Sequence, residues 1–97
     1  MEIDIAKAQT VFKILGEKNR IEVVQLLSKK DRRAIELSEL TDVRSVNISK
    51  HLDYLRKFGF VSAYKKGLHT YYHLENNILS GLIKYVLSGT LFQKRSS

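Results

Sequence analysis

The spacing of apolar residues along the chain changes twice, and these changes limit the folds that the chain can adopt. Up to about residue 57, apolar residues recur every three or four positions, which is typical of amphipathic helices. Gly16, Thr41-Asp42 and Gly59 follow such runs, where helix ends are expected. The four predicted helical stripes are Ile5, Ala8, Phe12 and Leu15; Ile21, Val24 and Leu27, with Val23 and Leu26; Ile35, Leu37 and Leu40; and Ile48, Leu52 and Leu55.

Residues 60–74 show a different pattern, because aromatic and β-branched side chains are frequent there. Phe60–Lys65 and His69–Leu74 are separated by the short turn Lys66-Gly67-Leu68, which predicts a β-hairpin. The helical pattern returns from Asn76 onward. We therefore expect a mainly α protein with the order α-α-α-α-β-β-α, whose hairpin packs against the helices. The length of 97 residues predicts a single domain spanning 1–97.

Both terminal helices carry more apolar residues than one core-facing stripe requires. The alternative to an interface is a last helix fully buried inside a monomer, but 97 residues are too few to surround it. Spare apolar faces on terminal helices favour a two-fold homodimer joined through the first and last helices. The residues predicted to form this interface are Ile5, Phe12, Leu79, Leu82, Ile83, Val86 and Leu87.

The net charge of +7 is distributed unevenly along the chain. Eight basic and eight acidic residues balance in the segment 1–43, whereas the segment 44–97 holds nine basic residues against Asp53 and Glu75. Such an asymmetry favours a polyanionic partner that binds one face. The alternative interpretation is that the charge serves solubility alone.

The segment from Ile35 to Leu55 predicts a helix-turn-helix, with a tight turn near 41–44. In its second helix, Ile48, Leu52 and Leu55 are expected to point inward. The polar residues near the start of this helix suit a recognition helix, whose N-terminal residues reach base edges; the alternative is a solvated helix face. The predicted DNA-binding residues are Arg44, Ser45, Asn47, Ser49 and Lys50, and the residues expected to face away from the core are Val46, Asn47, Lys50, Asp53, Tyr54 and Lys57.

These polar residues have distinct expected tasks. Arg44 and Lys50 suit phosphates or guanine, and the amide of Asn47 suits adenine. Ser45 and Ser49 suit phosphate contacts or helix capping.

The hairpin is expected to supply a second DNA contact. Lys65 and Lys66 precede its turn and His69 follows it, which places positive charge at a protruding tip. Such a tip suits the DNA backbone or the minor groove. Gly67 and Leu68 at the tip are typical of a loop that approaches a partner closely.

Two segments carry a family resemblance: FKILGEKNRIEVVQLL (12–27), with Arg20-Ile21 as an Arg–hydrophobic pair, and ELSELTDVRSVNISKHLDYLRKFGFVSAYKKGLHTYYHL (36–74). Together they resemble the second helix, recognition helix and wing of the ArsR-type family of winged helix-turn-helix transcriptional regulators, over roughly residues 9–75. The resemblance implies a homodimer that binds an imperfect palindrome and usually represses transcription.

The chain departs from that family in two respects. Arg44 stands where members usually have a Ser or Thr cap, so capping is expected from Ser45 or Asp42. Metal-sensing members of that family carry either a Cys pair in the third helix or Asp and His ligands in the last helix. Here those stretches read Ile35 to Leu40, and Asn76, Asn77, Ser80 and Tyr85. We therefore expect no metal site, no cofactor, and no obvious small-molecule or metal inducer; the alternative is a metal site formed across the dimer.

The sequence lacks the motifs that are typical of several other classes of protein. No nucleophile motif, phosphate-binding glycine loop or paired carboxylates near a His occur, so we do not expect an enzyme. There is no Cys, no apolar run long enough to span a membrane, and no secretory h-region, so we expect a cytoplasmic protein. The predicted function is a sequence-specific regulator, a repressor, that binds double-stranded DNA. The alternatives are a non-specific architectural DNA-binding protein and a protein-interaction module.

Overall fold

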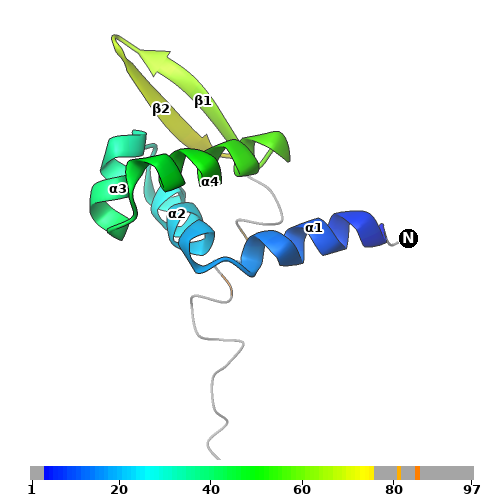
Figure 1. The fold of residues 1–97 in the computed structure, drawn as a ribbon. Coiled ribbons are helices and arrows are strands. Elements are labelled where there is room, and N and C mark those ends of the chain that lie inside the picture. Colours follow the sequence, from blue (N-terminus) through cyan, green and yellow to red (C-terminus); the bar gives the residue numbers. More distant parts are fainter. Residues whose placement is uncertain (1–3, 76–80, 82–84, 86–97) are drawn as a thin grey trace, which may run out of the picture.

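The computed structural model of the protein describes residues 4–75, together with Gly81 and Tyr85 (Figure 1). Four helices precede a two-stranded antiparallel sheet, which confirms the predicted order through the hairpin. The elements are α1 (Ile5–Leu15), α2 (Lys18–Lys29), α3 (Ala34–Thr41), α4 (Ser45–Lys57), β1 (Val61–Lys66) and β2 (His69–Leu74). The predicted last helix, with Leu79, Leu82, Ile83, Val86 and Leu87, lies outside the described residues, although Gly81 and Tyr85 have helical backbone.

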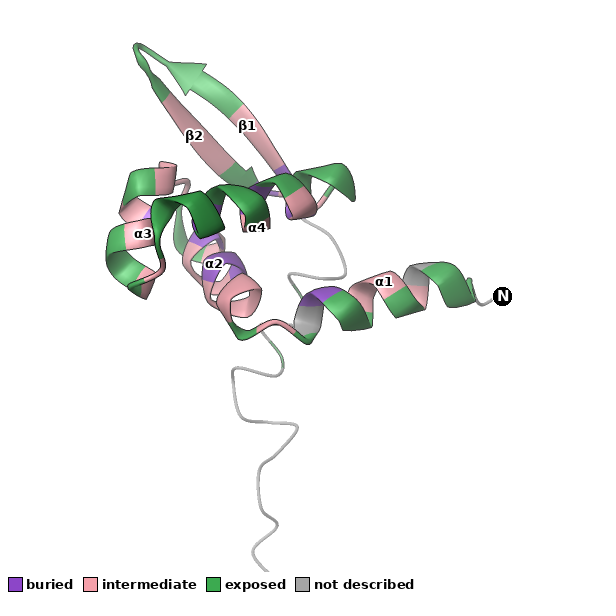
Figure 2. Ribbon diagram, in the orientation of Figure 1, coloured by how far each residue is buried: buried purple, intermediate pink, exposed green. Residues whose placement is uncertain are grey.

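The core lies where α2, α3 and α4 meet the base of the hairpin. Its members recur at helical spacing in α2 and α4, as the apolar stripes predicted, and β1 and β2 each contribute one residue. In Figure 2 the buried residues accordingly gather at the centre, while α1 extends away from them. The buried side chains are Ile14, Val23, Val24, Leu27, Leu37, Ile48, Leu52, Leu55, Val61 and Leu74.

The predicted short third helix is confirmed as α3, but only one of its three apolar residues is buried. Leu37 is fully buried, but Ile35 and Leu40 are each 55% exposed. The apolar character of Ile35 and Leu40 is therefore not explained by packing within the described part of the chain.

The hairpin has a shorter turn than its sequence predicts. Lys66 belongs to β1 and pairs with His69, which leaves a two-residue turn of Gly67 and Leu68. Gly67 has φ 65°, and a glycine with positive φ at the first turn position fits the right-handed twist of paired strands. The hairpin projects past α3 and α4 as a wing, whereas α1 extends in another direction (Figure 1).

A third chain segment pairs with the free edge of β2. The Arg32 N–H donates to the Tyr72 carbonyl at 3.2 Å, and the Tyr72 N–H donates back to the Arg32 carbonyl at 2.8 Å. The loop between α2 and α3 therefore covers part of an otherwise unpaired strand edge and fixes the wing beside α3.

No helix in the described part of the chain is long and apolar enough to cross a membrane.

Candidate nucleic-acid interface

The second helix of the helix-turn-helix, α4, has a buried side and an exposed side. Ile48, Leu52 and Leu55 are fully buried, as predicted. The predicted DNA-binding residues of this region all lie on the surface: Arg44, Ser45, Asn47, Ser49 and Lys50 are exposed. The front of α4 is correspondingly exposed along its length in Figure 2. The polar side chains of the N-terminal half of α4 are therefore accessible to a large ligand.

Tyr54 is an exception to the predicted outward orientation. It is partly buried and packs against the core, its ring meets Phe58 edge-on at 5.1 Å, and the Arg20 guanidinium lies 4.3 Å above it. The prediction was wrong because α2 brings Arg20 over this side of α4, a long-range contact that helical periodicity cannot show.

The N-terminus of α4 is not capped by a side chain. The helix begins at Ser45 with Arg44 at the N-cap position, so the predicted capping by Ser45 or Asp42 is not observed. The Arg44 carbonyl accepts hydrogen bonds from the Asn47 and Ile48 amides, at 2.9 and 3.0 Å. The first amide groups of a helix point out of its end and carry partial positive charge, which favours an anion there. Phosphate oxygens are anions of this kind.

The turn between α3 and α4 is fixed by short hydrogen bonds. The Ser38 hydroxyl donates to the Val43 carbonyl at 2.5 Å, and the Thr41 hydroxyl donates to the Leu37 carbonyl at 2.6 Å. The Val43 N–H in turn donates to Thr41 Oγ1 at 3.3 Å. Asp42 takes a left-handed conformation at the end of α3, which allows the sharp change of direction. These contacts hold α4 at a defined angle to α3.

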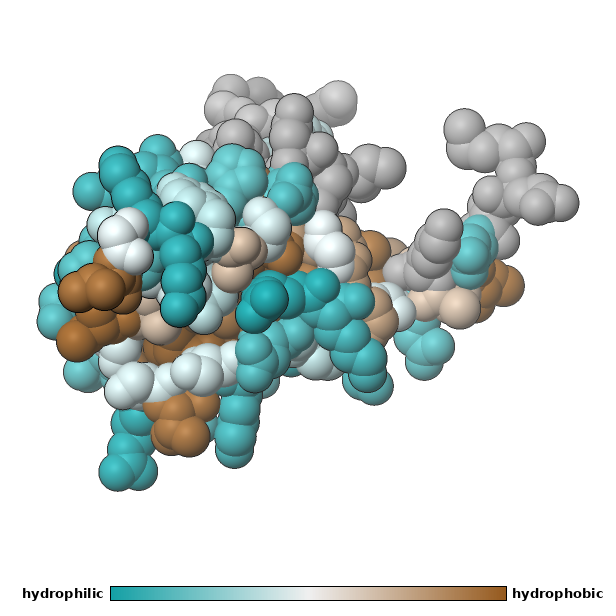
Figure 3. Space-filling model, turned by 90° about the horizontal axis from the view of Figure 1, so that it is seen from above, coloured by the Kyte–Doolittle hydropathy of each residue, from teal (hydrophilic) through white to brown (hydrophobic). Residues whose placement is uncertain are grey.

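The wing presents its predicted residues at the surface. Lys65, Lys66 and His69 are exposed, and Leu68 at the tip is 96% exposed. Seen from above, this side of the molecule is mainly hydrophilic, with small separate hydrophobic patches (Figure 3). Six basic residues in the segment 44–74, against the single acid Asp53, are all exposed: Arg44, Lys50, Arg56, Lys57, Lys65 and Lys66. The charge asymmetry of the sequence therefore becomes a positively charged surface on α4 and the wing.

Two contacts with the α2–α3 loop hold the wing, and sequence reasoning missed both. Asp31 accepts hydrogen bonds from the Tyr64 hydroxyl at 2.5 Å and from His73 Nδ1 at 2.7 Å. These bonds, the one from Tyr64 first, lower the pKa of Asp31 below its ordinary value of 3.8. The same contacts with Asp31 raise the pKa of Tyr64 and that of His73.

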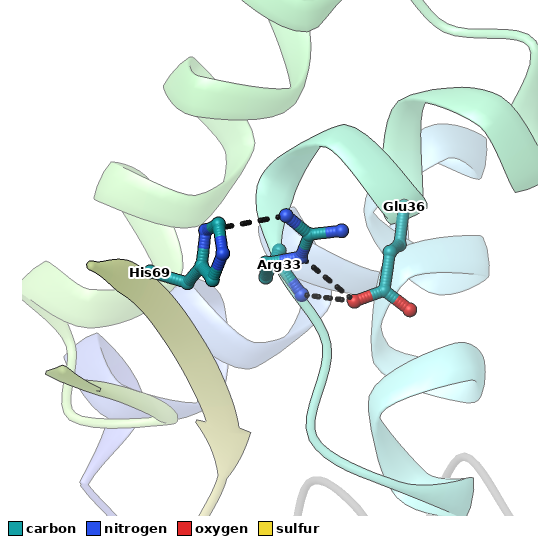
Figure 4. Close-up of polar contacts among 3 residues, drawn as sticks. All are labelled: Arg33, Glu36 and His69. Carbon is teal, nitrogen blue, oxygen red and sulfur yellow. Dashed lines mark hydrogen bonds and ion pairs between the residues drawn. The ribbon is translucent and has the colours of Figure 1, made fainter. Parts of the chain in front are cut away.

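The second contact joins the wing to the start of α3 (Figure 4). Arg33 Nη1 lies 3.3 Å from His69 Nδ1, while the Arg33 N–H and Nε donate to Glu36 Oε1 at 3.1 and 3.5 Å. Because an arginine can only donate, His69 Nδ1 accepts in this contact. Nε2 is then the ring nitrogen of His69 that can donate to another partner. The backbone hydrogen bond from Arg33 is the largest cause that lowers the pKa of Glu36.

The histidines contact different partners. His69 contacts Arg33 and His73 contacts Asp31. His51 is half-buried in α4, and burial, followed by the nearby charge of Arg20, lowers its pKa. Among residues 4–75, 81 and 85, no group of three His, Asp or Glu side chains is arranged to hold a metal ion.

The first helix exposes the apolar residues that were predicted for an interface. Ile5 is 77% exposed and Phe12 is 69% exposed, whereas Ile14 is fully buried. These exposed side chains lie on the helix that extends away from the core (Figure 1).

Comparisons with known proteins agree with this geometry. The family model described as "Bacterial regulatory protein, arsR family" matches residues 17–63. The chain is 30% identical over 78 residues to the transcriptional repressor SdpR of Bacillus subtilis, which covers 80% of this chain and 87% of SdpR. The cadmium resistance transcriptional regulatory proteins CadC of Listeria innocua and of Lactococcus lactis are each 31% identical to the chain over 74 residues, which is 75% of this chain. The chain spans only 62% of the length of these two relatives.

Solved structures have the same fold. The chain of the transcriptional activator HlyU of Vibrio cholerae superimposes with a TM-score of 0.79 at 26% identity, covering 95% of this chain and 98% of that one. The homodimeric winged helix-turn-helix DNA-binding domain Mb0332 of Mycobacterium bovis also gives a TM-score of 0.79, at 21% identity, covering 96% of this chain and 89% of that one. The helix-turn-helix and wing described above are therefore those of a winged helix-turn-helix fold.

Proposed function

Because this chain belongs to the arsR family of bacterial regulatory proteins, we propose that it regulates transcription by binding double-stranded DNA sequence-specifically as a homodimer. The observation that carries this proposal is that the polar residues at the start of α4 are exposed. The α3–α4 turn holds this helix at a fixed angle, and the wing adds further positively charged residues to the same proposed DNA-binding surface. A recognition helix needs such an exposed N-terminal half in order to reach base edges in the major groove.

The proposal assigns a task to each exposed residue. Asn47 reads adenine through its amide, and Arg44 and Lys50 contact phosphates or guanine. Ser45 and Ser49 contact phosphate oxygens at the positive end of α4. On the wing, Lys65, Lys66 and the Nε2–H of His69 contact the adjacent backbone or minor groove. The residues that carry these tasks are Arg44, Ser45, Asn47, Ser49, Lys50, Lys65, Lys66 and His69.

The dimer in this proposal forms through the exposed face of α1, with Ile5 and Phe12, and through the last helix, with Leu79, Leu82, Ile83, Val86 and Leu87. The fold neighbour from Mycobacterium bovis is homodimeric, which supports a dimer here. Two-fold symmetry then presents the two recognition helices to successive major grooves, about 34 Å apart on an imperfect palindrome. A dimer bound at a promoter excludes the polymerase, so we propose repression.

We further propose that the protein is one domain over residues 1–97, that it is cytoplasmic, and that it has no catalytic activity and no cofactor. We assign no inducer either. The sequence contains no Cys, so a thiolate metal site or a disulfide switch within this chain is excluded.

Two variants test the proposal. Sequences selected from a random duplex pool are bound by wild-type protein, Asn47→Ala and Lys66→Ala, and the dissociation constants are measured by fluorescence anisotropy at several salt concentrations. We expect Asn47→Ala to cost about 1–3 kcal/mol on the selected sequence and to relax base preference. We expect Lys66→Ala to weaken binding to all sequences alike and to reduce the salt slope by about one per subunit.

The outcomes separate the possible functions. Equal affinity of the wild-type protein for selected and random duplexes would indicate an architectural DNA-binding protein. Absence of tight DNA binding at physiological salt would indicate a protein-interaction module. Unchanged affinity in both variants would contradict the assignment of the site. A promoter–reporter strain then gives the direction of regulation, where deletion of the protein is expected to raise expression.

A further inference from the structure

Arg20, in the first turn of α2, binds carbonyl groups at the C-terminal end of α1. Its Nη2 donates to the Lys13 carbonyl at 2.8 Å, and its Nε lies 3.4 Å from the Ile14 carbonyl. The last carbonyls of a helix have no partner within the helix and carry partial negative charge. A guanidinium placed there satisfies two of them and interacts favourably with the helix dipole. Arg20 therefore fixes the C-terminus of α1 to α2.

The same guanidinium contacts the recognition helix. It lies 4.3 Å above the ring of Tyr54, a distance at which a cation is attracted to an aromatic face. Tyr54 is itself held by the core and by the edge of Phe58. One side chain thus joins α1 and α4, which the chain separates by two other helices.

Few other contacts within the described residues fix the direction of α1. Ile14 is fully buried, and Val11 packs partly against the core. The connection to α2 consists only of Gly16 and Glu17. The remainder of α1 extends away from the helix-turn-helix (Figure 1). A contact at the C-terminal end of α1 consequently has a strong influence on the angle at which the helix leaves the core.

We infer that Arg20 is a positioning residue that sets the angle between α1 and α4, and thereby the spacing of DNA half-sites that the dimer accepts. The inference rests on the proposed function, because it requires α1 to form the dimer and α4 to read DNA. In a dimer with recognition helices about 34 Å apart, each helix lies about 17 Å from the two-fold axis. A tilt of about 10° over a lever of that length moves each helix by about 3 Å, and because the two helices move in opposite directions, their separation changes by up to about 6 Å, more than the rise of one base pair.

The experiment measures affinity against half-site spacing. A palindrome selected by the wild-type protein from a random duplex pool is resynthesised with its centre shortened or lengthened by one and two base pairs. A duplex with one half-site is included. Dissociation constants are measured for the wild type and for Arg20→Lys, which keeps the charge but loses the planar donor geometry.

A second test variant and three controls accompany Arg20→Lys. Tyr54→Leu removes the aromatic face while keeping an apolar side chain, and Tyr54→Phe keeps the face. Lys18→Ala removes an exposed cation from the same helical turn as Arg20. Sedimentation of each variant shows whether it remains a dimer. If Arg20→Lys does not fold, Tyr54→Leu tests the same contact from the other side.

We expect the wild type to prefer the selected spacing over a shift of one base pair by about tenfold or more, a loss similar to that of one mismatched base pair. Arg20→Lys and Tyr54→Leu should reduce this preference to about threefold or less, or move the optimum, with unchanged dimerisation and single half-site affinity. Tyr54→Phe and Lys18→Ala should keep the wild-type profile. Folded Arg20→Lys and Tyr54→Leu variants with the wild-type spacing profile, or with an equal loss on every duplex, would overturn the inference. A wild-type protein with no preference for any palindrome would contradict the proposed function itself.

Discussion

Asp42 is the residue at which the chain changes direction between α3 and α4. It is the one non-glycine residue with positive φ among the residues that the structure describes, with φ 59° and ψ 26°. This left-handed conformation is unfavourable for side chains with a Cβ, least so for Asp and Asn, and most unfavourable for β-branched residues. The angle of the recognition helix therefore depends on a position with a narrow choice of residues.

We expect Asp42→Val to lower the free energy of unfolding by about 1–2 kcal/mol, because valine is strained in this conformation. Asp42→Gly should leave the free energy of unfolding unchanged or raise it by up to about 1 kcal/mol, since glycine adopts positive φ without strain. Both variants lose the same carboxylate, so the difference between them isolates the backbone effect. Denaturant unfolding followed by circular dichroism measures it, and identical midpoints for the two variants would be inconsistent with a strained turn.

Sequence reasoning missed several side-chain contacts between residues that lie far apart along the chain. Ile48, Leu52 and Leu55 were placed correctly because their burial follows from helical periodicity alone. Tyr54 lies on the same helix and was expected to face solvent, yet α2 brings Arg20 over it. Arg33 and Asp31 were not considered as partners of the wing histidines, because no local pattern connects residues separated by 36 and 42 positions.

At the scale of elements, the wing is held by a loop that carries no secondary-structure pattern of its own. The segment around Asp31 and Arg32 pairs with β2 and binds Tyr64 and His73, so it acts as a short third strand. Helix and strand boundaries were predictable from the period of the apolar residues. The pairing of this loop with β2 could not be predicted from the sequence, because it depends on where α2 ends relative to the hairpin.

The contact of His73 with Asp31 makes the stability of the wing dependent on pH. Asp31 raises the pKa of His73 above 6.5, so this contribution is complete below pH 6.5 and is lost as pH rises through the raised pKa. The pKa of Asp31 is lowered below 3.8, so its contribution is complete above pH 3.8 and is lost as pH falls through the lowered pKa. The pair is therefore fully effective between the two ordinary values.

We expect His73→Gln to lower the free energy of unfolding at pH 5.5 to 6 more than at pH 8.5. The difference should stay below about 1 kcal/mol, because the His73 side chain is 49% exposed and solvent screens the pair. Urea unfolding at both pH values measures it. Asp31→Asn should remove most of the pH dependence of the His73 effect, since only the weaker effect of Glu75 remains, and a His73→Gln cost that is equal at both pH values would contradict the ion pair.

His51 gives a useful internal comparison, since its pKa is shifted in the opposite direction. Burial, and then the charge of Arg20, lower the pKa of His51 below 6.5, so this residue destabilises the fold as pH falls through 6.5. The pH dependence of the wild type is thus the sum of two opposing effects. Only the difference between wild type and variant reports the wing contact.

At the scale of the whole molecule, the two functional surfaces lie on different elements. The positively charged residues of the proposed DNA-binding surface belong to α4, its N-cap and the wing, whereas the exposed apolar residues Ile5 and Phe12 belong to α1. A single subunit offers one recognition helix, and binding of both half-sites by one dimer raises affinity through effective concentration. Loss of the dimer should therefore weaken DNA binding without changing any DNA-contacting residue.

We expect the double variant Ile5→Ser and Phe12→Ser to shift the protein toward a monomer and to weaken binding to the selected palindrome by about 100-fold or more, because the avidity of two linked sites is lost. Its affinity for a single half-site should not change. Circular dichroism should stay like that of the wild type at matched subunit concentration, since the mutated side chains are 77% and 69% exposed in one subunit and Ile14 retains the core contact. Leu40→Ser is the matched control, because Leu40 is an apolar residue with 55% exposure on α3, away from the proposed interface. Sedimentation velocity at micromolar concentration decides the point: a double variant that sediments as the wild-type dimer would show that α1 does not hold the subunits together.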